Sequence, residues 1–368
     1  MVMEFKIGDR WIGPDHPCFI IAEIGVNHNG DVKMATELID VAKRAGADAA
    51  KFQTFHPEDV VVPDAPKAAY QTATTKAVES QFEMLSKLSL NQESFISLKD
   101  RVERLGMVFL STPADPKDVD FLVSIGVSAL KVASMDIVNY PLLERIGRTG
   151  LPAIVSTGMA SLGEIEKGVA VLQREGCDNL VLMHCVTNYP IPEEEANLRV
   201  MDTLSTAFGF PVGFSDHTAS PYVSIAAAAL GACIIEKHFT LNHGLEGPDH
   251  ASSLEPWDFK RMADGIRVAR KALGSRRKKL TASELDNRRT MRRSLVYSRH
   301  LAAGTLLEPE HFAFKRPMNG LGAEYMPTFM GQKLKRDVLA DSNFKLSDID
   351  WVDPPQGARI GRQEHDHA

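Results

Sequence analysis

Residues 18–25, CFIIAEIG, form a short and continuously apolar run, and residues 35–46, ATELIDVAKRAG, follow it with the period of an amphipathic helix. A run of this length and composition is typical of a strand that is buried on both faces. One face of the following segment carries the apolar side chains Ala35, Leu38, Ile39 and Ala42. The sequence therefore predicts a buried strand followed by a helix that packs against it.

The same unit, an apolar run followed by a segment of helical period, recurs eight times. The runs begin at Cys18, Ala49, Met107, Ala129, Ala153, Leu180, Pro211 and Cys233. Eight strands with helical connections in about 250 residues are the dimensions of a TIM (β/α)8 barrel, and an open doubly wound sheet is the alternative. Polar side chains favour the barrel, because they gather at the carboxyl ends of these runs, which a barrel brings to one rim.

The composition points to an ordinary globular protein. The chain has 368 residues, of which 44% are hydrophobic and 24% charged, and its formal net charge is −6. Mixed charges without interleaved aromatic residues argue against a nucleic-acid partner. No apolar run approaches the roughly 20 residues that span a bilayer, so no membrane partner is expected. The four cysteines form no CxxC pair, which favours a cytoplasmic location with reduced thiols.

The pattern of the sequence changes after the last helix of the predicted barrel, from strands followed by helices to short β-like segments. We predict a barrel domain at 1–275, a charged linker at 276–293, a small β-rich domain at 294–353 and a disordered tail at 354–368. The basic run at the start of the linker is interpreted as a solvated connector.

Two histidines indicate a metal site. His217 and His238 end the seventh and eighth runs, which are neighbouring strands in a barrel and hence about 4.8 Å apart. Both imidazoles can therefore reach one ion. With only two protein nitrogens, most coordination positions stay open for water and substrate, which is typical of a catalytic metal.

Lysines and hydroxyl groups at other strand ends indicate an anion site. Lys51 and Lys131 lie in apolar strands, where an ammonium group needs a negative partner. That partner is either a carboxylate of the chain, Glu23 or Asp136, or a bound phosphate or carboxylate. Hydroxyl donors at strand ends suit the same anion, namely Ser134, Ser156 and Ser215. Glu23 is interpreted either as a base or as charge balance for Lys51.

Motifs along the chain resemble those of the N-acetylneuraminate synthase family. They include AEIGVNHNGD from Ala22, HCVTNYP from His184, GFSDHT from Gly213 and GPDHASSLEP from Gly247. The segment AGTLLEPEHFAFKRP from Ala303 is similar to part of the antifreeze-like (SAF) domain that these enzymes carry at the C-terminus. The resemblance implies a TIM barrel with a small C-terminal SAF domain, in a domain-swapped homodimer.

The resemblance also assigns roles to individual residues. His217 and His238 match the ligands of a divalent metal, manganese first, with magnesium or cobalt as alternatives, and Glu23 matches the catalytic glutamate. The positions that hold phosphoenolpyruvate are Lys51, Thr112, Lys131, Ser134, Ser156, Thr187 and Ser215. The positions that line the sugar site are Gln53, Asp136, Tyr189, Asp249 and, across the dimer, Arg316.

The implied activity is N-acetylneuraminate synthesis from phosphoenolpyruvate, N-acetylmannosamine and water, with cleavage of a C–O bond. N,N'-diacetyllegionaminate synthesis from 2,4-diacetamido-2,4,6-trideoxymannose is the alternative, and ESQFEMLSKLSL from Glu79 is similar to that branch. A metal-dependent barrel hydrolase usually carries HxH on its first strand, whereas here that strand ends Glu23-Ile24-Gly25. A non-catalytic sugar-binding protein has no use for the lysines, serines and glutamate beside a metal.

Overall fold

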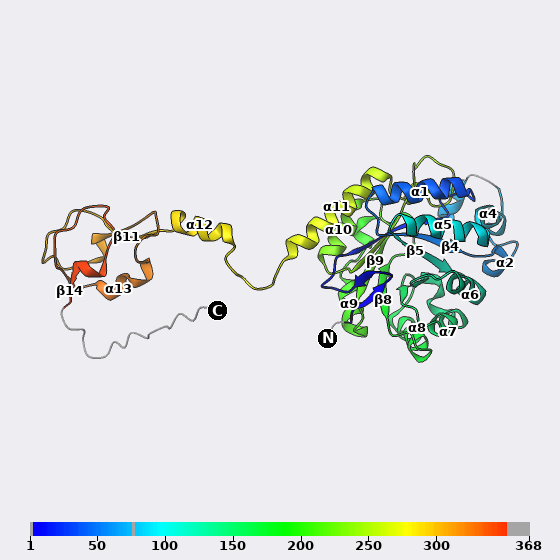
Figure 1. Cartoon of the computed structure of the whole chain (residues 1–368), viewed down its shortest axis with the longest axis horizontal. Coiled ribbons are helices and arrows are strands. Elements are labelled where there is room, and N and C mark those ends of the chain that lie inside the picture. Colours follow the sequence, from blue (N-terminus) through cyan, green and yellow to red (C-terminus); the bar gives the residue numbers. More distant parts are fainter. Residues whose placement is uncertain (1–2, 76–77, 352–368) are drawn as a thin grey trace. The chain divides into compact units, whose positions relative to one another are not determined.

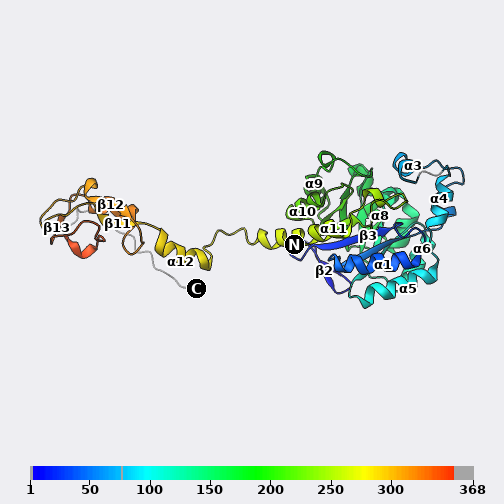
Figure 2. The same cartoon turned by 90° about the horizontal axis from the view of Figure 1, so that it is seen from above.

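The chain folds into two compact units, one running from Met1 to Gly274 and the other beginning at Ser275. The computed structural model describes residues 3–75 and 78–351 (Figures 1 and 2). No helix within these ranges is both long enough and apolar enough to cross a membrane.

The first unit is built on a parallel eight-stranded sheet whose hydrogen-bonded order is β5-β4-β3-β10-β9-β8-β7-β6. Its end strands, β5 and β6, lie against each other, so the sheet curls into a nearly closed barrel. All eight predicted strands are present, which confirms the barrel and excludes the open sheet. Their bounds are β3 Phe19–Gly25, β4 Ala49–Thr54, β5 Val108–Pro113, β6 Leu130–Val132, β7 Ala153–Ser156, β8 Leu180–Cys185, β9 Val212–Asp216 and β10 Ile234–His238.

Helices follow the strands and surround the barrel (Figure 1). The helices of this ring are α1 Val32–Arg44, α5 Gln92–Arg104, α6 Pro116–Ser124, α7 Tyr140–Gly147, α8 Leu162–Arg174, α9 Val200–Phe208, α10 Pro221–Ala229 and α11 Pro256–Leu273. The predicted apolar face of α1 is fully buried. One connection departs from the simple pattern: the segment between β4 and α5 carries α2 Pro57–Val60, α3 Ala69–Thr75 and α4 Gln81–Leu88. In Figure 2, α3 and α4 stand out from the barrel wall.

Side chains alternate along each strand between the helices and the barrel interior. In β3, Ile20 and Ala22 pack in the cluster shared with the helices, whereas Phe19 and Ile21 belong to the cluster inside the barrel. The interior cluster also contains strand residues Ala49, Leu110, Ile154, Val181, Met183 and Ile234, together with Ala129 just before β6. The interior is thus a packed core at the amino ends of the strands, as barrel geometry requires.

A short hairpin closes this end of the barrel. It consists of β1, Phe5–Ile7, and β2, Arg10–Ile12, which pair in antiparallel fashion. Phe5, Ile7 and Ile12 are buried and pack in the interior cluster. Since the hairpin covers the amino ends, the polar carboxyl ends of the strands remain as the open side.

The second unit has its own small core. Its strands are β11 Ser294–Tyr297, β12 Phe312–Lys315, β13 Lys333–Leu334 and β14 Ile349–Asp350. Tyr297, Phe312 and Phe344 are buried in one aromatic cluster. The stretch predicted as a linker contains helix α12, Ala282–Met291, and a short helix α13, Met326–Phe329, precedes β13. The predicted disordered tail at 354–368 lies outside the described residues.

Candidate active site

A cavity of about 280 Å³ opens at the carboxyl ends of the barrel strands. Strand alternation explains its lining, because on several strands the last apolar interior position is followed two residues later by a polar one. Ile21 is followed by Glu23, Ala49 by Lys51 and Ile234 by Glu236. The packed core therefore ends in a polar floor.

The cavity brings together every site residue predicted in the barrel. They are Glu23, Lys51, Gln53, Thr112, Lys131, Ser134, Asp136, Ser156, Thr187, Tyr189, Ser215, His217, His238 and Asp249. Arg316 belongs to the second unit, where its Nη1 lies 3.5 Å from Met291 Sδ. Its contact with a sugar across a dimer stays a prediction.

Lys51 lies in the cavity between two carboxylates. Its Nζ is 2.8 Å from Glu23 Oε2 and 3.6 Å from Glu236 Oε1, and it donates a hydrogen bond of 3.1 Å to Thr112 Oγ1. All three charged side chains are almost completely buried. Of the two partners that the sequence left open for Lys51, the carboxylate of Glu23 is thus present in the folded chain.

Lys131 has a different environment. Its Nζ donates to Ser156 Oγ at 2.6 Å and to the carbonyl of Val132 at 2.9 Å, and both acceptors are neutral. The predicted alternative, a salt bridge to Asp136, is not formed among the described residues. Burial lowers the pKa of Lys131, although the nearby Glu236 opposes this effect. An anion bound beside this ammonium would offset the cost of burying it.

Glu23 is buried, and its surroundings shift the pKa of its carboxyl group. Burial raises its pKa to about 7, while the neighbouring Lys51 works in the opposite direction. Gln53 Nε2 donates to Glu23 Oε1 at 2.9 Å and fixes the carboxyl group. A carboxyl group that titrates near neutral pH is suited to general acid–base chemistry.

The cavity contains two further residues, Glu236 and Cys185. The sequence placed Glu236 among the polar residues at the end of the eighth strand but gave neither residue a role in the site. Glu236 Oε1 accepts from Ser215 Oγ at 3.2 Å, and its Oε2 is buried without a hydrogen-bond partner among the described residues. Cys185 Sγ lies 3.8 Å from His217 Nδ1. Both residues occupy interior positions of their strands, two residues after Ile234 and Met183. Because every second residue of a strand faces the barrel interior, this spacing could have identified both residues from the sequence.

His217 and His238 face each other in the cavity, with ring centroids 5.6 Å apart. His217 Nδ1 is 2.7 Å from the carbonyl oxygen of Val186, and since a carbonyl only accepts, this nitrogen carries the proton. The neutral ring then has its lone pair on Nε2. His238 Nδ1 is buried without a hydrogen-bond partner in the described part of the chain, and burial holds the pKa of His238 well below its ordinary value. Burial lowers the pKa of His217, but the neighbouring Cys185 and the contact with Val186 outweigh it and raise this pKa, so His217 must release a proton before its Nε2 can bind an ion. Nε2 of His217 and the orphaned nitrogen of His238 then fit a divalent metal.

Behind the histidines lies a buried ion pair. Lys237 and Asp216 occupy the strand positions that point away from the cavity, and Lys237 Nζ is 3.1 Å from Asp216 Oδ2 with both side chains fully buried. Lys237 also donates to the carbonyl of Thr218, and Asp216 accepts from the Thr218 backbone N–H at 2.9 Å. Because these contacts flank His217 and His238 in the chain, the pair fixes the backbone that carries both histidines.

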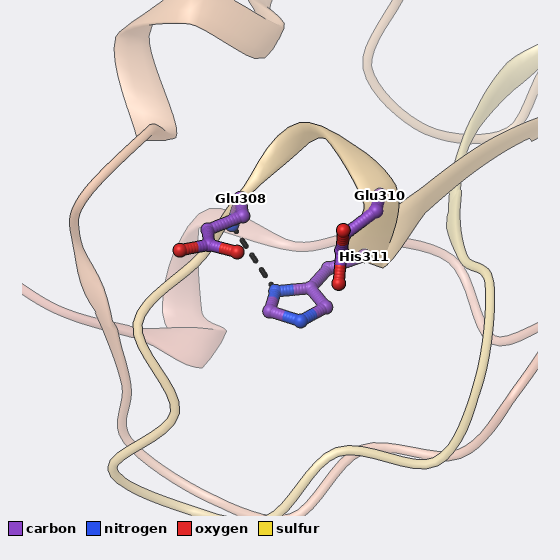
Figure 3. Close-up of side chains that lie close together, drawn as sticks. All are labelled: Glu308, Glu310 and His311. Carbon is purple, nitrogen blue, oxygen red and sulfur yellow. Dashed lines mark hydrogen bonds between the residues drawn. The ribbon is translucent and has the colours of Figure 1, made fainter.

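A second group of potential metal ligands lies in the other unit. Figure 3 shows Glu308, Glu310 and His311 close together. His311 Nδ1 accepts a hydrogen bond of 3.1 Å from the Glu308 backbone N–H, so the neutral ring carries its proton on Nε2 and has no lone pair to offer. Glu310 is paired with Arg299 at 2.9 Å. This cluster is therefore a structural cap for the short turn before β12.

Comparison with known proteins agrees with the architecture. The model of the NeuB family matches residues 38–278, and that of the SAF domain matches residues 292–350. The N,N'-diacetyllegionaminic acid synthases of Campylobacter jejuni and Legionella pneumophila are 42% and 40% identical, over 90% and 92% of this chain and 98% and 96% of theirs. The crystal structure of the N-acetylneuraminic acid synthetase from Leptospira borgpetersenii in complex with citrate is 35% identical, with a TM-score of 0.69 over 78% of this chain and 95% of that one.

The substitution Lys237→Met is expected to lower the free energy of unfolding by about 3 kcal/mol, because it leaves the Asp216 carboxylate buried without its cation. Denaturant unfolding of the purified protein measures the loss. Lys260→Met is the control, since Lys260 pairs with Asp264 on the exposed surface and its removal should change stability by less than about 1 kcal/mol. Equal losses in the two variants would contradict the structural importance of the buried pair.

Proposed function

The chain belongs to the NeuB family, and on that basis we propose that it condenses phosphoenolpyruvate with an N-acetylated aldose of the mannosamine type to form a sialic acid and phosphate. One observation carries this proposal: two buried lysines and two facing histidines share a single cavity. Such a site can hold an anionic enol phosphate beside an aldehyde. The sequences of the relatives support the sugar-acid product.

In this proposal the lysines and hydroxyl groups bind phosphoenolpyruvate. Lys131 and Ser156 lie 2.6 Å apart and present an ammonium and a hydroxyl group to the same place. Ser134 Oγ accepts from the Gly158 backbone N–H at 3.1 Å and donates to Cys185 Sγ at 3.6 Å, a weak contact that its hydroxyl proton can exchange for the ligand. The proposed phosphoenolpyruvate site also includes Thr112, Thr187, Ser215 and Lys51. Donors held in a buried cavity are preorganised for the charge of phosphate and carboxylate.

The histidines are proposed to hold a divalent metal, with manganese as the first candidate. The lowered pKa and the orphaned Nδ1 of His238, with His217 beside it, support this assignment. When bound, such an ion supplies Lewis-acid polarisation of the sugar aldehyde. The chain itself orients the ligands, because the hydrogen bond to Val186 fixes the His217 ring.

The bond changes follow from this arrangement. Carbon 3 of phosphoenolpyruvate attacks the aldehyde carbon, and water adds at carbon 2. The resulting tetrahedral species expels phosphate together with the bridging oxygen and becomes the 2-keto acid, so the new keto oxygen comes from water. Glu23 is the proposed base that takes a proton from this water, which suits its pKa of about 7.

The remaining predicted residues are proposed to surround the sugar. Tyr189 stacks near His217, with ring centroids 4.1 Å apart, and Asp249 Oδ2 lies 3.5 Å from His238 Nδ1. Gln53 and Asp136 also line the cavity. Arg316 is proposed to reach the N-acetyl group from the partner subunit of a domain-swapped homodimer.

Two aldoses remain candidates. N-acetylmannosamine would give N-acetylneuraminate, and 2,4-diacetamido-2,4,6-trideoxymannose would give N,N'-diacetyllegionaminate. The first is favoured by the resemblance of the motifs, and the second by the identity of 42% and 40% to two legionaminic acid synthases.

Phosphoenolpyruvate labelled with heavy oxygen at the bridge between carbon 2 and phosphorus should deliver all of that label to inorganic phosphate. The reason is that the proposed reaction breaks the C–O bond and leaves the P–O bond intact. The experiment uses the full chain with manganese and either aldose, and mass spectrometry of the released phosphate gives the result. Label in the sugar acid or in pyruvate would refute the condensation, and phosphate release without any aldose would indicate a hydrolase.

Removal of divalent ions with a chelator should abolish turnover, and manganese should restore it. His217→Ala and His238→Ala should each lose bound metal and at least about 100-fold in rate, because each removes one of two protein ligands. Elemental analysis measures the metal separately from activity. His311→Ala, in the structural cap of the second unit, is the control and should keep the metal content. Wild-type metal content in both active-site variants would show that the ion is held elsewhere.

Glu23→Ala and Arg316→Ala should each be inactive alone but should regain activity when their subunits are exchanged. In a swapped dimer, half of the mixed dimers are hybrids and one of their two sites is intact, so about one quarter of the wild-type activity is expected. Exchange is verified with two differently tagged chains. If the exchanged sample stays inactive, Arg316 does not act on the partner's barrel.

A further inference from the structure

The cavity has two chemically distinct ends. The polar floor carries its charged groups, including Lys51, Lys131 and Glu236. Toward α4 the lining becomes an apolar wall, which consists of Val26, Phe55, Val60, Met84, Leu85 and Leu88. Four of these residues, Val26, Phe55, Met84 and Leu88, are buried and form a hydrophobic cluster separate from the two barrel cores.

The direction from floor to wall follows the strands. Along β4 the positions that face the cavity are Lys51 and Gln53, and Phe55 comes two residues later in the same direction. On the other side, Tyr189 links the histidines to the α3 helix, with ring centroids 4.1 Å from His217 and 5.2 Å from Tyr70. A sugar whose aldehyde lies at the histidines therefore extends its far carbons toward the wall.

Few polar groups are free near the wall. Gln71 and Gln81 line the cavity there, and Gln71 Oε1 accepts from Gln81 Nε2 at 3.3 Å and from the Ala68 backbone N–H at 2.9 Å. Among the described residues that line the cavity, the lysines lie on the floor and none lies on the wall. A phosphate group placed against the wall would lose its hydration without gaining a cation, and a hydroxyl group there would depend on the amide groups of Gln71 and Gln81.

From this geometry we infer that the apolar wall selects the aldose at the end remote from its aldehyde and favours a methyl group there over a hydroxymethyl or phosphorylated group. The inference rests on the proposed function and deepens it. Met84 and Leu88 are its specificity-determining residues, since both are buried against the cavity. Of the two candidate sugars, the wall accepts 2,4-diacetamido-2,4,6-trideoxymannose.

The test compares kcat/KM for three aldoses with phosphoenolpyruvate and manganese. They are N-acetyl-6-deoxymannosamine, N-acetylmannosamine and N-acetylmannosamine 6-phosphate, which differ from one another only at carbon 6. The wild-type enzyme should prefer the first by about 10- to 100-fold, the range in which an apolar pocket discriminates. Met84→Gln, which places an amide in the wall at nearly constant volume, should reduce this preference about 10-fold.

Matched variants separate specificity from stability. Phe82→Gln lies on the same helix but faces a different surface depression, so it should leave the preference unchanged. Val60→Asn changes a wall residue that is partly exposed, at 39%, and it should lower the preference without loss of folding, as checked by thermal melting. Met84→Leu should retain the wild-type preference.

Each outcome decides one claim. A preference that falls in Met84→Gln and Val60→Asn but not in Phe82→Gln supports selection of the aldose by the apolar wall. Equal losses of kcat/KM for all three sugars, or a wild-type preference for the hydroxymethyl or phosphorylated sugar, would overturn it while the condensation stands. If none of the three sugars reacts with phosphoenolpyruvate, the proposed function fails, and the inference fails with it.

Discussion

The alternation of side chains along eight parallel strands is the constraint on which both the core and the site depend. Interior positions such as Ile21, Ala49 and Ile234 must be apolar to pack against one another and against the hairpin that closes the barrel. Two residues further along, the same parity reaches the open end, where Glu23, Lys51 and Glu236 converge. One geometric rule thus makes the amino end of the barrel stable and the carboxyl end reactive.

Charged side chains can be buried above the apolar core only because ion pairs and hydrogen bonds among them offset the cost of removing them from water. Lys51 lies between Glu23 and Glu236, and the cluster is fixed by hydrogen bonds from Gln53 and Ser215. Lys131 lacks a carboxylate at hydrogen-bond distance among the described residues and is held by Ser156 and a backbone carbonyl. Lys51 is therefore neutralised by carboxylates and Lys131 is not, so an anion is stabilised most when it binds beside Lys131.

Much of this arrangement could be predicted from the sequence, because buried strands and strand-end polar residues leave a pattern of fixed period. The eight strands, the face of α1 and the gathering of fourteen site residues in one cavity follow from that pattern together with the family motifs. Glu236 and Cys185 were given no role in the site, although the same parity marks them. The partner of Lys131 could not be predicted, since Asp136 lies near it in the sequence but in a 3-10 turn, where its carboxylate accepts from Asn139 instead.

The inserted segment between β4 and α5 obeys none of these periodic rules. Its helices are short, and its apolar residues form a cluster of their own against Val26 and Phe55. Because Met84 and Leu88 contact neither barrel core, their replacement leaves the strand positions of Glu23, Lys51 and the histidines untouched. The barrel therefore separates two tasks physically: strand ends hold the reacting groups, while a segment packed on top of them shapes the space for the rest of the sugar. This separation lets one reaction serve aldoses that share the aldehyde end and differ in their remaining carbons.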